Sequence, residues 1–290
     1  MNSIYLDPIL GWYEANARDL PWRADDATPW GVLVSEIMLQ QTPVARVLPV
    51  WQTWMRRWPA PADLAAEPSG EAVRAWGRLG YPRRALRLHG SARAITERHG
   101  GAVPSAHEEL LALPGIGSYT AAAVASFAFR QRHAVLDTNV RRVLARLLGG
   151  VEYPPKSQTR AEVRLAESLL PLDPPTAARW AVAVMELGAL VCTARTPRCA
   201  DCPVIASCAW QRAGRPAYDG PPRRGQTYAG TDRQCRGRLL AVLRDAEGPV
   251  EKPALDVVWS DAVQRERALD ALVADGLVDP LQDGRYALPV

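Results

Sequence analysis

The helical spacing of apolar residues constrains the fold of this chain most strongly. Few segments before residue 230 alternate apolar and polar residues as a β-strand does. Short segments containing Pro or Gly separate the helical stretches. Residues 1–210 or so are therefore predicted to form one compact all-helical unit. Apolar residues recur at intervals of three and four in residues 31–48, 71–77, 83–98, 120–129 and 140–148.

The composition changes after this helical part. Residues 213–232 are rich in Gly, Pro, Arg and Tyr, which predicts a linker. Beyond it, residues 236–244 and 260–275 have helical patterns, and residues 277–288 are typical of two short strands around a glycine turn. Two helices followed by a hairpin predict a small winged-helix-like α+β module over residues 233–290.

The totals are those of a globular protein with a moderately basic surface. Hydrophobic residues make up 48% and charged residues 23% of the 290 residues. No apolar run approaches the roughly 18 residues of a membrane span, and no basic leader precedes an apolar core at the start, so a cytoplasmic location is expected. The net charge is +4 and almost all cations are arginine, whose planar fork of donors suits phosphate. This balance permits a polyanionic partner without requiring one.

Four of the five cysteines lie in one segment, CTARTPRCADCPVIASC, with the spacing C-x6-C-x2-C-x5-C. Clustered cysteines in a chain without a secretory signal indicate a metal site before disulfides. Four thiolates suit either tetrahedral zinc or an iron–sulfur cluster, and the spacing of the cysteine pair alone does not choose between them. Cys235 lies outside the segment and is expected to be an ordinary, partly buried thiol. The four candidate ligands are Cys192, Cys199, Cys202 and Cys208.

The cysteine spacing, which follows closely behind a G-h-G turn, resembles the endonuclease III and MutY branch of DNA glycosylases over about residues 6–212. This resemblance implies an all-α helix-hairpin-helix glycosylase fold over residues 1–212. A six-helix module would span about 23–137, and a module carrying a 4Fe–4S cluster would combine 1–22 with 138–212. It also implies a monomer that binds double-stranded DNA with a mismatched or damaged base pair, in the bacterial nucleoid and with no membrane partner.

The G-h-G turn stands in LPGIGSYTA and contains Gly115 and Gly117. Glycine tolerates positive φ and close backbone approach, and a turn before a helix exposes N–H groups to a phosphate. A plain helix-ending turn is the alternative. The segment is similar to the helix-hairpin-helix of this superfamily, which implies a phosphate held by backbone amides, often with a monovalent cation.

Tyr119 occupies the position at which the bifunctional members of the superfamily carry a lysine nucleophile. A phenol cannot form a Schiff base, and the nearer of the two lysines, Lys156, lies 37 residues further along the chain. The resemblance therefore implies base removal without strand cleavage, unless the N-terminal amine substitutes.

Two carboxylates are candidates for cleaving an N-glycosidic bond, which needs a proton for the leaving base and a stabiliser for the sugar cation. Glu36 lies in the apolar helical stretch GVLVSEIMLQQT, where desolvation favours its protonated form, although a surface glutamate would fit the pattern too. Asp137 precedes Thr-Asn and a helical run, as a helix N-cap does. By resemblance, Glu36 protonates adenine at N7, Asp137 stabilises or captures the sugar cation, Asn139 orients the neighbouring groups, and Tyr119 joins this network.

A base must leave the duplex stack before its glycosidic bond can be reached, and a side chain usually fills the vacancy. The resemblance of SEIMLQQT to the MutY motif places Gln40, Gln41 and Thr42 by the target, with Gln41 filling space in the opened duplex. Tyr81 in RLGYPRR matches the aromatic wedge of the family, but Pro82 replaces its second tyrosine.

The segment ARDLPWR and the acidic Glu186 resemble the adenine pocket of the family. At a position where many members carry a polar side chain, this chain has Val182. The predicted pocket residues are Arg18, Leu20, Trp22, Arg23 and Glu186.

These features predict a monofunctional adenine DNA glycosylase of base excision repair that acts on adenine opposite 8-oxoguanine or guanine. A glycosylase that removes T or U opposite G is a second prediction, and a non-catalytic binder of damaged DNA is a third. The presence of both Glu36 and Asp137 argues against the third. Residues 209–290 depart from the family, because many MutY proteins carry a Nudix-like β-rich domain there that checks for 8-oxoguanine.

Overall fold

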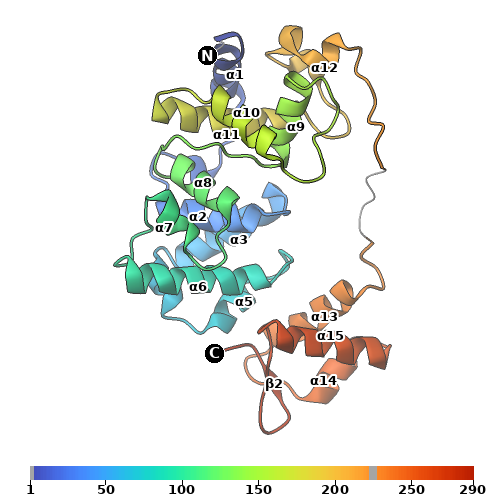
Figure 1. The fold of residues 1–290 in the computed structure, drawn as a ribbon. Coiled ribbons are helices and arrows are strands. Elements are labelled where there is room, and N and C mark those ends of the chain that lie inside the picture. Colours follow the sequence, from blue (N-terminus) through green and yellow to red (C-terminus); the bar gives the residue numbers. More distant parts are fainter. Residues whose placement is uncertain (1–2, 222–226) are drawn as a thin grey trace. The chain divides into compact units, whose positions relative to one another are not determined.

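The computed structural model describes residues 3–221 and 227–290, and nearly all of its regular structure is helical (Figure 1). Residues 222–226 of the predicted linker and residues 1–2 lie outside the described residues. The chain divides into two units. The first unit contains residues 3–32, 105–111 and 116–221, and the second contains residues 33–104, 112–115 and 227–290.

The first unit is built around three long helices. Its elements are α1 (Ser3–Asn16), the 3-10 turn η1 (Pro21–Arg23), the start of α2 (Pro29–Leu39), α7 (His107–Leu111), α8 (Ser118–Phe127), α9 (Thr138–Leu147), α10 (Arg160–Leu169), α11 (Pro174–Leu190), η2 (Cys199–Asp201), η3 (Ile205–Ser207) and α12 (Ala209–Arg212). Helix α11 packs against α1 and α9. Its core is apolar and includes Ile9, Val143, Leu147, Val184 and Leu187.

Side-chain caps fix where the helices of this unit begin. Thr159 accepts from the amide of Glu162, and the Glu162 carboxylate accepts from the amide of Thr159, which is a capping box for α10. Asp173 caps α11 in the same way through the amide of Thr176. These caps satisfy amides that the first turn of a helix leaves without partners.

The second unit contains the rest of α2, then α3 (Val44–Arg57), α4 (Pro61–Ala65), α5 (Ser69–Trp76) and α6 (Arg83–Arg98), followed after the linker by α13 (Asp232–Asp245), α14 (Lys252–Asp256), α15 (Ala262–Ala274), β1 (Asp279–Pro280) and β2 (Tyr286–Ala287). The two strands pair antiparallel, and Val250 forms a bridge to Tyr286. Three helices with a strand hairpin confirm the winged-helix-like module, which also contains the short helix α14 that the sequence pattern did not reveal (Figure 1).

The predicted helices are present with small shifts of their ends, and one prediction was wrong. Helix α6 spans the predicted 83–98, but residues 31–48 form two helices rather than one. Residues 40–43 turn the chain between them, because Gln41 has φ 55° and Pro43, at the start of α3, disfavours helical backbone in the residue before it. The turn places Gln40, Gln41 and Thr42 outside both helices.

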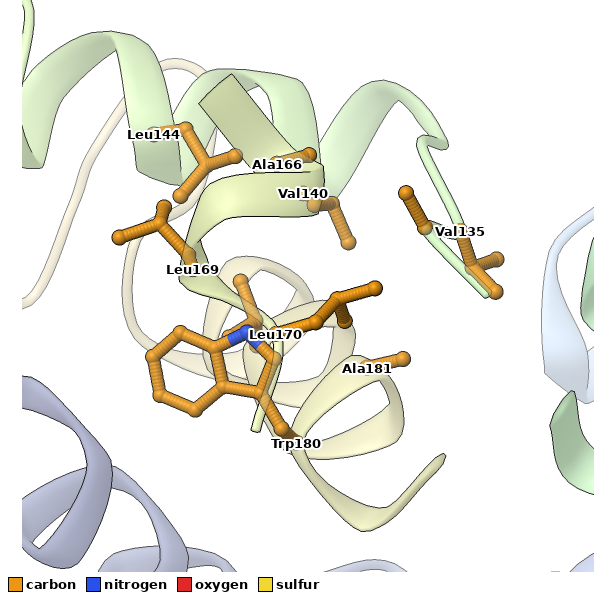
Figure 2. Close-up of a pocket in the computed structure, with 10 residues that line it drawn as sticks. Val135, Val140, Leu144, Ala166, Leu169, Leu170, Trp180 and Ala181 are labelled. Carbon is orange, nitrogen blue, oxygen red and sulfur yellow. The ribbon is translucent and has the colours of Figure 1, made fainter. Parts of the chain in front are cut away.

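No helix among residues 3–221 and 227–290 has both the length and the apolar character that crossing a lipid bilayer needs. Helices α9, α10 and α11 enclose an apolar cavity of about 20 Å³, with Trp180 along one side (Figure 2). Apolar cavities of this kind stay dry and bind no polar substrate. The side chains that line this cavity carry no acid, base or nucleophile for a reaction.

Candidate active site and cysteine cluster

Asp137 is the N-cap of α9, and its carboxylate is fixed by two hydrogen bonds. Oδ1 accepts from the amide of Val140 at 2.7 Å and Oδ2 accepts from Nδ2 of Asn139 at 2.7 Å. Burial raises the pKa of Asp137, and these two hydrogen bonds oppose that rise without cancelling it. The side chain is half-buried. The structure therefore presents a poorly solvated carboxylate in one fixed orientation.

Asn139 connects Asp137 to the cysteine segment through Arg142. The Arg142 guanidinium donates to Oδ1 of Asn139 at 2.8 Å, to the carbonyl of Gly188 at 2.6 Å and to the carbonyl of Cys192 at 2.7 Å. Gly188 must be glycine here, because an added Cβ would lie 2.7 Å from the Cβ of Asn139. Arg142 was not predicted from the sequence, because nothing in the pattern distinguishes it from the other arginines of this helix.

The four clustered cysteines lie in or against one apolar core, and Cys202 feels the charges of the other three. All are free thiols, Cys208 is buried in the apolar core, and the other three pack against that core. Burial raises the pKa of Cys192, and it raises that of Cys202 to about 11, with the charges of the other three cysteines adding to the rise at Cys202. Thiols of this kind ionise at neutral pH when a metal binds them.

Arg146 holds the same segment from α9. Arg146 is 1% exposed, and its guanidinium donates to Sγ of Cys192 at 3.4 Å and to the carbonyl of Thr193 at 2.7 Å. Within residues 3–221 and 227–290, no three His, Cys, Asp or Glu side chains stand close enough together to hold a metal ion as they are. Arg142 and Arg146 thus bind the start of the cysteine segment by hydrogen bonds.

The predicted pocket residues Arg18, Arg23 and Glu186 meet in the first unit. Glu186 is fully buried and accepts from Arg18 through Nε at 2.6 Å and Nη2 at 2.7 Å, while Nη2 of Arg23 lies 2.9 Å from Oε2. Burial alone would raise the pKa of Glu186, but the hydrogen bonds and charges of the two arginines lower it to about 2. Nη1 of Arg23 is buried and has no hydrogen-bond partner within the described residues. Leu20 and Trp22 belong to the same sequence segment as Arg18 and Arg23, and both are buried.

Glu36 lies in the middle of α2 and is 6% exposed. Residues 31–38 of this helix are all buried, so Glu36 is not the glutamate of a solvated helix face. The role of Glu36 as a proton donor stays a prediction.

Arg84 connects two turns of the second unit, the one that follows α2 and the one that precedes α6. It was not predicted from the sequence. Arg84 is 5% exposed, and its guanidinium lies 5.5 Å from the ring centroid of Tyr81. Burial lowers the pKa of Arg84 to about 10. Its acceptors are the carbonyls of Ile37, Met38, Gln40 and Gly80 and the hydroxyl of Thr42, at 2.6 to 3.1 Å.

The turns held by Arg84 carry Gln41 and Tyr81, the two side chains that are predicted to enter the opened duplex. Gln41 has φ 55° and Tyr81 has φ 48°, a left-handed backbone that is uncommon for residues other than glycine. Both side chains are exposed, Tyr81 to 46%. Backbone held in such conformations clusters at ligand-contacting sites. The contacts of these residues with DNA remain predictions.

The two hairpin glycines differ in their surroundings. Gly115 has φ +77°, and a Cβ there would lie 2.6 Å from the Cβ of Arg87, so both its conformation and its neighbour require glycine. Gly117 is extended, begins α8, and has open space where a Cβ would be. Leu113 and Ile116 are buried, which leaves the backbone at the glycines exposed.

Tyr119 lies in the first turn of α8, and its ring packs against a small apolar cluster that includes Ala122, Val135 and Ala181. The sequence also contains no lysine between Tyr119 and Lys156. The predicted hydrogen bonding of Tyr119 with Asp137 stays a prediction.

Comparison with known proteins places this site in a family. Residues 34–168 match the model of the HhH-GPD superfamily base excision DNA repair protein family. The adenine DNA glycosylase of Mycobacterium tuberculosis (strain CDC 1551 / Oshkosh) is 56% identical over 285 residues, which cover 97% of this chain and 92% of that protein. The adenine DNA glycosylase of Mycolicibacterium smegmatis is 53% identical over 281 residues, covering 97% and 94%.

A solved structure gives the same fold. The structure of a thermostable thymine-DNA glycosylase matches this chain with a TM-score of 0.66 and 29% identity, over 72% of this chain and 96% of that one. The match confirms the predicted helix-hairpin-helix glycosylase fold. With this fold, the matched superfamily model and relatives of more than 50% identity along nearly the whole chain, the protein belongs to the adenine DNA glycosylase family of the HhH-GPD superfamily.

Proposed function

We propose that this protein hydrolyses the N-glycosidic bond of adenine paired with 8-oxoguanine or guanine in double-stranded DNA and leaves the strand intact. The observation that carries the proposal is the Asp137 carboxylate, which is half-buried and fixed by Asn139 and the amide of Val140. A glycosidase needs such a carboxylate opposite the cation that forms at the sugar. Family membership supports adenine as the base removed.

The reaction uses two carboxyl groups with opposite charge states. Glu36, buried in α2, gives its proton to the leaving adenine, so that the base departs as a neutral molecule. Asp137 stays ionised and stabilises the positive charge that develops at the anomeric carbon. Water then adds to that carbon and gives up one proton to the Glu36 carboxylate, which leaves an abasic sugar and returns Glu36 to its protonated form.

The strand is not cut, because Tyr119 occupies the position at which bifunctional members of the superfamily carry the lysine nucleophile. A Schiff base with the opened sugar needs an amine, and a phenol does not provide one. The ring of Tyr119 instead packs against the apolar side chains of Val135 and Ala181.

Arg18, Arg23 and Glu186 form the pocket that receives the extruded adenine. Glu186 is held ionised by the two arginines, so it can only accept a hydrogen bond, as the exocyclic amine of adenine requires. The buried Nη1 of Arg23, without a partner in the described chain, offers a donor to a ring nitrogen. A flipped base is commonly read through hydrogen bonds of this kind.

Gln41 and Tyr81 fill the space that the extruded adenine leaves, and the hairpin holds a backbone phosphate. At Gly117 the open space before α8 admits a phosphate to the amides of the helix N-terminus. A monovalent cation at the hairpin carbonyls would complete this site, as the resemblance to the superfamily implies.

Cys192, Cys199, Cys202 and Cys208 would hold a 4Fe–4S cluster. The donor set fits such a group, because four free thiols share one electrostatic neighbourhood and no disulfide links them. When bound, the cluster would join the segment that follows α11 to α12 and fix its loop. Arg142 and Arg146 hold the segment in position from α9.

We also propose that the protein is a monomer and acts on the bacterial nucleoid. Its glycosylase domain would span residues 1–212, with a six-helix module at about 23–137 and a cluster module made of 1–22 and 138–212. A linker at 213–232 would connect this domain to the winged-helix-like module. Gel filtration with light scattering tests the monomer, and limited proteolysis tests the linker.

Single-turnover assays on A:8-oxoguanine, A:G, T:G and U:G duplexes test the function. We expect adenine release from the first two, with strand breaks only after alkali. Asp137→Asn should abolish release and retain duplex binding. The matched control is Asp173→Asn, which changes an N-cap of the same kind on α11 and should keep full activity. Release of thymine without adenine, or breaks without alkali, would overturn the proposal.

A further inference from the structure

The winged-helix-like module, counted from the first residue of α13 at Asp232 to residue 290, is acidic, which is unusual for a DNA-binding module. It carries eight Arg or Lys residues against eleven Asp or Glu residues, a net charge of −3, while residues 1–231 carry +7. Binding to DNA depends on cations that neutralise phosphates. The charge of the module therefore directs attention to its contacts with its own chain.

The cations of α15 are engaged within the module. Arg265 donates to Asp256 at 3.0 Å, and Arg267 donates to both carboxylate oxygens of Asp232 at 2.8 and 3.0 Å. The corresponding helix of a DNA-reading winged helix presents its polar side chains to the groove. In this module they instead join α15 to α14 and to the start of α13.

The module docks on α5 through an exchange of arginines. Arg74 of α5 donates to the carbonyls at the end of α13, at 2.7 Å for Ala246 and also to that of Arg244. Arg244 in turn donates through Nε to the carbonyl of Val73 at 2.9 Å. Each arginine thus satisfies main-chain oxygens of the other helix, which favours one fixed register between α5 and α13.

The C-terminal segment adds a main-chain contact at the start of α5. The amide of Gly70 donates to the carbonyl of Pro289 at 2.7 Å. A Cβ at residue 70 would lie only 2.5 Å from that oxygen, so glycine is what permits this approach. The end of the chain is therefore packed against α5.

A second docking point lies at the start of α6. Asp275, which follows α15, forms an ion pair with Arg83 at 3.1 Å and accepts a hydrogen bond from Arg236 of α13. A Cβ added at the next residue, Gly276, would lie 4.0 Å from Cδ1 of Leu86 in α6. The module thus holds α6 at its first turn, as it holds α5 along its length.

Between these docking points lies the wedge loop, which we define as residues 77–82. It connects the end of α5 with the start of α6 and carries Tyr81. The guanidinium of Arg233, in the first turn of α13, lies 5.7 Å from the ring centroid of Tyr81, within reach of a cation–π contact. The module accordingly contacts both ends of the loop and the aromatic ring itself.

We propose that the winged-helix-like module is a brace for the wedge loop, so that Tyr81 can be driven into the duplex at the unpaired base without the loop yielding. Asp275 is the positioning residue at the centre of this brace, through its contacts with Arg83 and Arg236. The inference rests on the proposed function, because it gives the module a part in opening the mispair. It assigns the module a mechanical role within the protein in place of a second DNA-reading surface.

The test measures insertion of Tyr81 without any chemistry. A duplex carries a stable abasic analogue in place of the adenine and 2-aminopurine beside the base opposite it. Unstacking at that point raises the fluorescence, and a Tyr81→Ala variant shows how much of the rise depends on the wedge. The proteins are full-length chains at saturating concentration, below their unfolding temperatures.

The deciding comparison is Asp275→Asn against Asp256→Asn. Asp256 pairs with Lys252 and Arg265 inside the module and has no part in the docking contacts described above, so the two variants lose the same kind of ion pair. We expect the Tyr81-dependent rise to fall about two- to five-fold in Asp275→Asn, the range that partly exposed ion pairs cover. Asp256→Asn should give the full rise. Arg74→Lys keeps the charge but loses the planar set of guanidinium donors. It should lower the Tyr81-dependent rise in fluorescence as Asp275→Asn does.

Each outcome separates the brace from the proposed function. A full rise with Asp275→Asn and Arg74→Lys, or equal losses in Asp275→Asn and Asp256→Asn, would overturn the brace. If the wild-type protein gives the rise, and Asp275→Asn lowers it, but no adenine is released from any mispair, the brace stands and the proposed function fails.

Discussion

Asn139 lies between the candidate catalytic carboxylate and a buried arginine: its Nδ2 donates to Oδ2 of Asp137 at 2.7 Å, and its Oδ1 accepts from Arg142 at 2.8 Å. The arginine settles which way the amide points, because Arg142 can only donate. Asn139 must therefore present its NH2 group to Asp137. One amide thus couples the orientation of the carboxylate to the helix that holds the cysteine segment.

This relationship predicts a pH effect. Burial raises the pKa of Asp137 and the Asn139 hydrogen bond lowers it, so replacing Asn139 with Leu should raise it further. Because the ionised form is the active one, the acid limb of the single-turnover rate should move to higher pH in Asn139→Leu. At neutral pH the rate should fall roughly ten-fold, since hydrogen bonds to charged groups contribute about 1.5–3 kcal/mol.

Thr138→Ala provides the control for that profile, because Thr138 is exposed and adjacent in the same helix turn. Its acid limb should coincide with that of the wild type. Equal limbs in Asn139→Leu and Thr138→Ala would contradict the role given to the amide.

Glu186 predicts a loss of stability on acidification. Its pKa is about 2 in the folded protein and 4.5 in the ordinary state, so its ionisation stabilises the fold above about 4.5, and this contribution disappears as the pH falls toward 2. Glu186→Gln should lower the free energy of unfolding at pH 7 by about 3 kcal/mol, because two arginines lose a buried partner.

Denaturant unfolding at several pH values measures this contribution. The difference between wild type and Glu186→Gln should shrink as the pH falls from 5 toward 2. Glu14→Gln offers a control, because Glu14 pairs with Arg179 on the exposed surface. A difference that stays constant with pH would refute the ionised, arginine-bound state of Glu186.

Arg84 predicts that lysine cannot replace arginine in the second unit. Lysine keeps the charge but cannot reach five oxygens that lie in the fork of one guanidinium. Arg84→Lys should slow adenine release from a paired duplex by about ten-fold, since each lost hydrogen bond contributes ~1 kcal/mol. Adenine that is already unstacked, opposite an abasic site, should be released with a smaller loss.

Leu88→Ala serves as the comparison for Arg84, because Leu88 is fully buried one turn further along α6 and has no polar group. It should destabilise the protein and affect both substrates alike. If Arg84→Lys also affects both substrates alike, Arg84 contributes stability alone.

The hairpin glycines predict opposite effects of the same substitution. Gly115→Ala should destabilise the fold by about 1–3 kcal/mol, because φ is +77° and the new Cβ would meet Arg87. Gly117→Ala should leave thermal unfolding unchanged, since its Cβ would enter open space. It should nevertheless weaken duplex binding if a phosphate occupies that space. Unchanged binding in Gly117→Ala would remove Gly117 from the phosphate site.

The sequence predicted the fold where local pattern determines structure. Helix α6 has the predicted ends because its apolar spacing is regular from residue 83 to 98. The split between α2 and α3 was missed, since apolar periodicity runs across residues 40–43 while the turn depends on the left-handed backbone of Gln41. Helix α14 was missed because five residues give too little periodicity to detect.

The site was predictable in its members and not in its connections. Arg18 and Glu186 were both named from motifs, but their ion pair spans 168 residues of sequence, and only the packing of the first unit brings them together. Arg84 and Arg142 gave no signal, because an arginine that binds main-chain carbonyls has no partner visible in the sequence. The docking of the acidic module on α5 likewise depends on carbonyl oxygens, which every residue carries.

The left-handed backbones of Gln41 and Tyr81 have a consequence for how the protein would search a genome. Each conformation costs on the order of 1–3 kcal/mol, and the folded protein bears that cost before it meets DNA. These two turns then need no ordering at each encounter, so they lose little entropy per base pair tested. Such a protein can bind each correct base pair for a short time, and its two preformed turns are already in place when it meets a mispair.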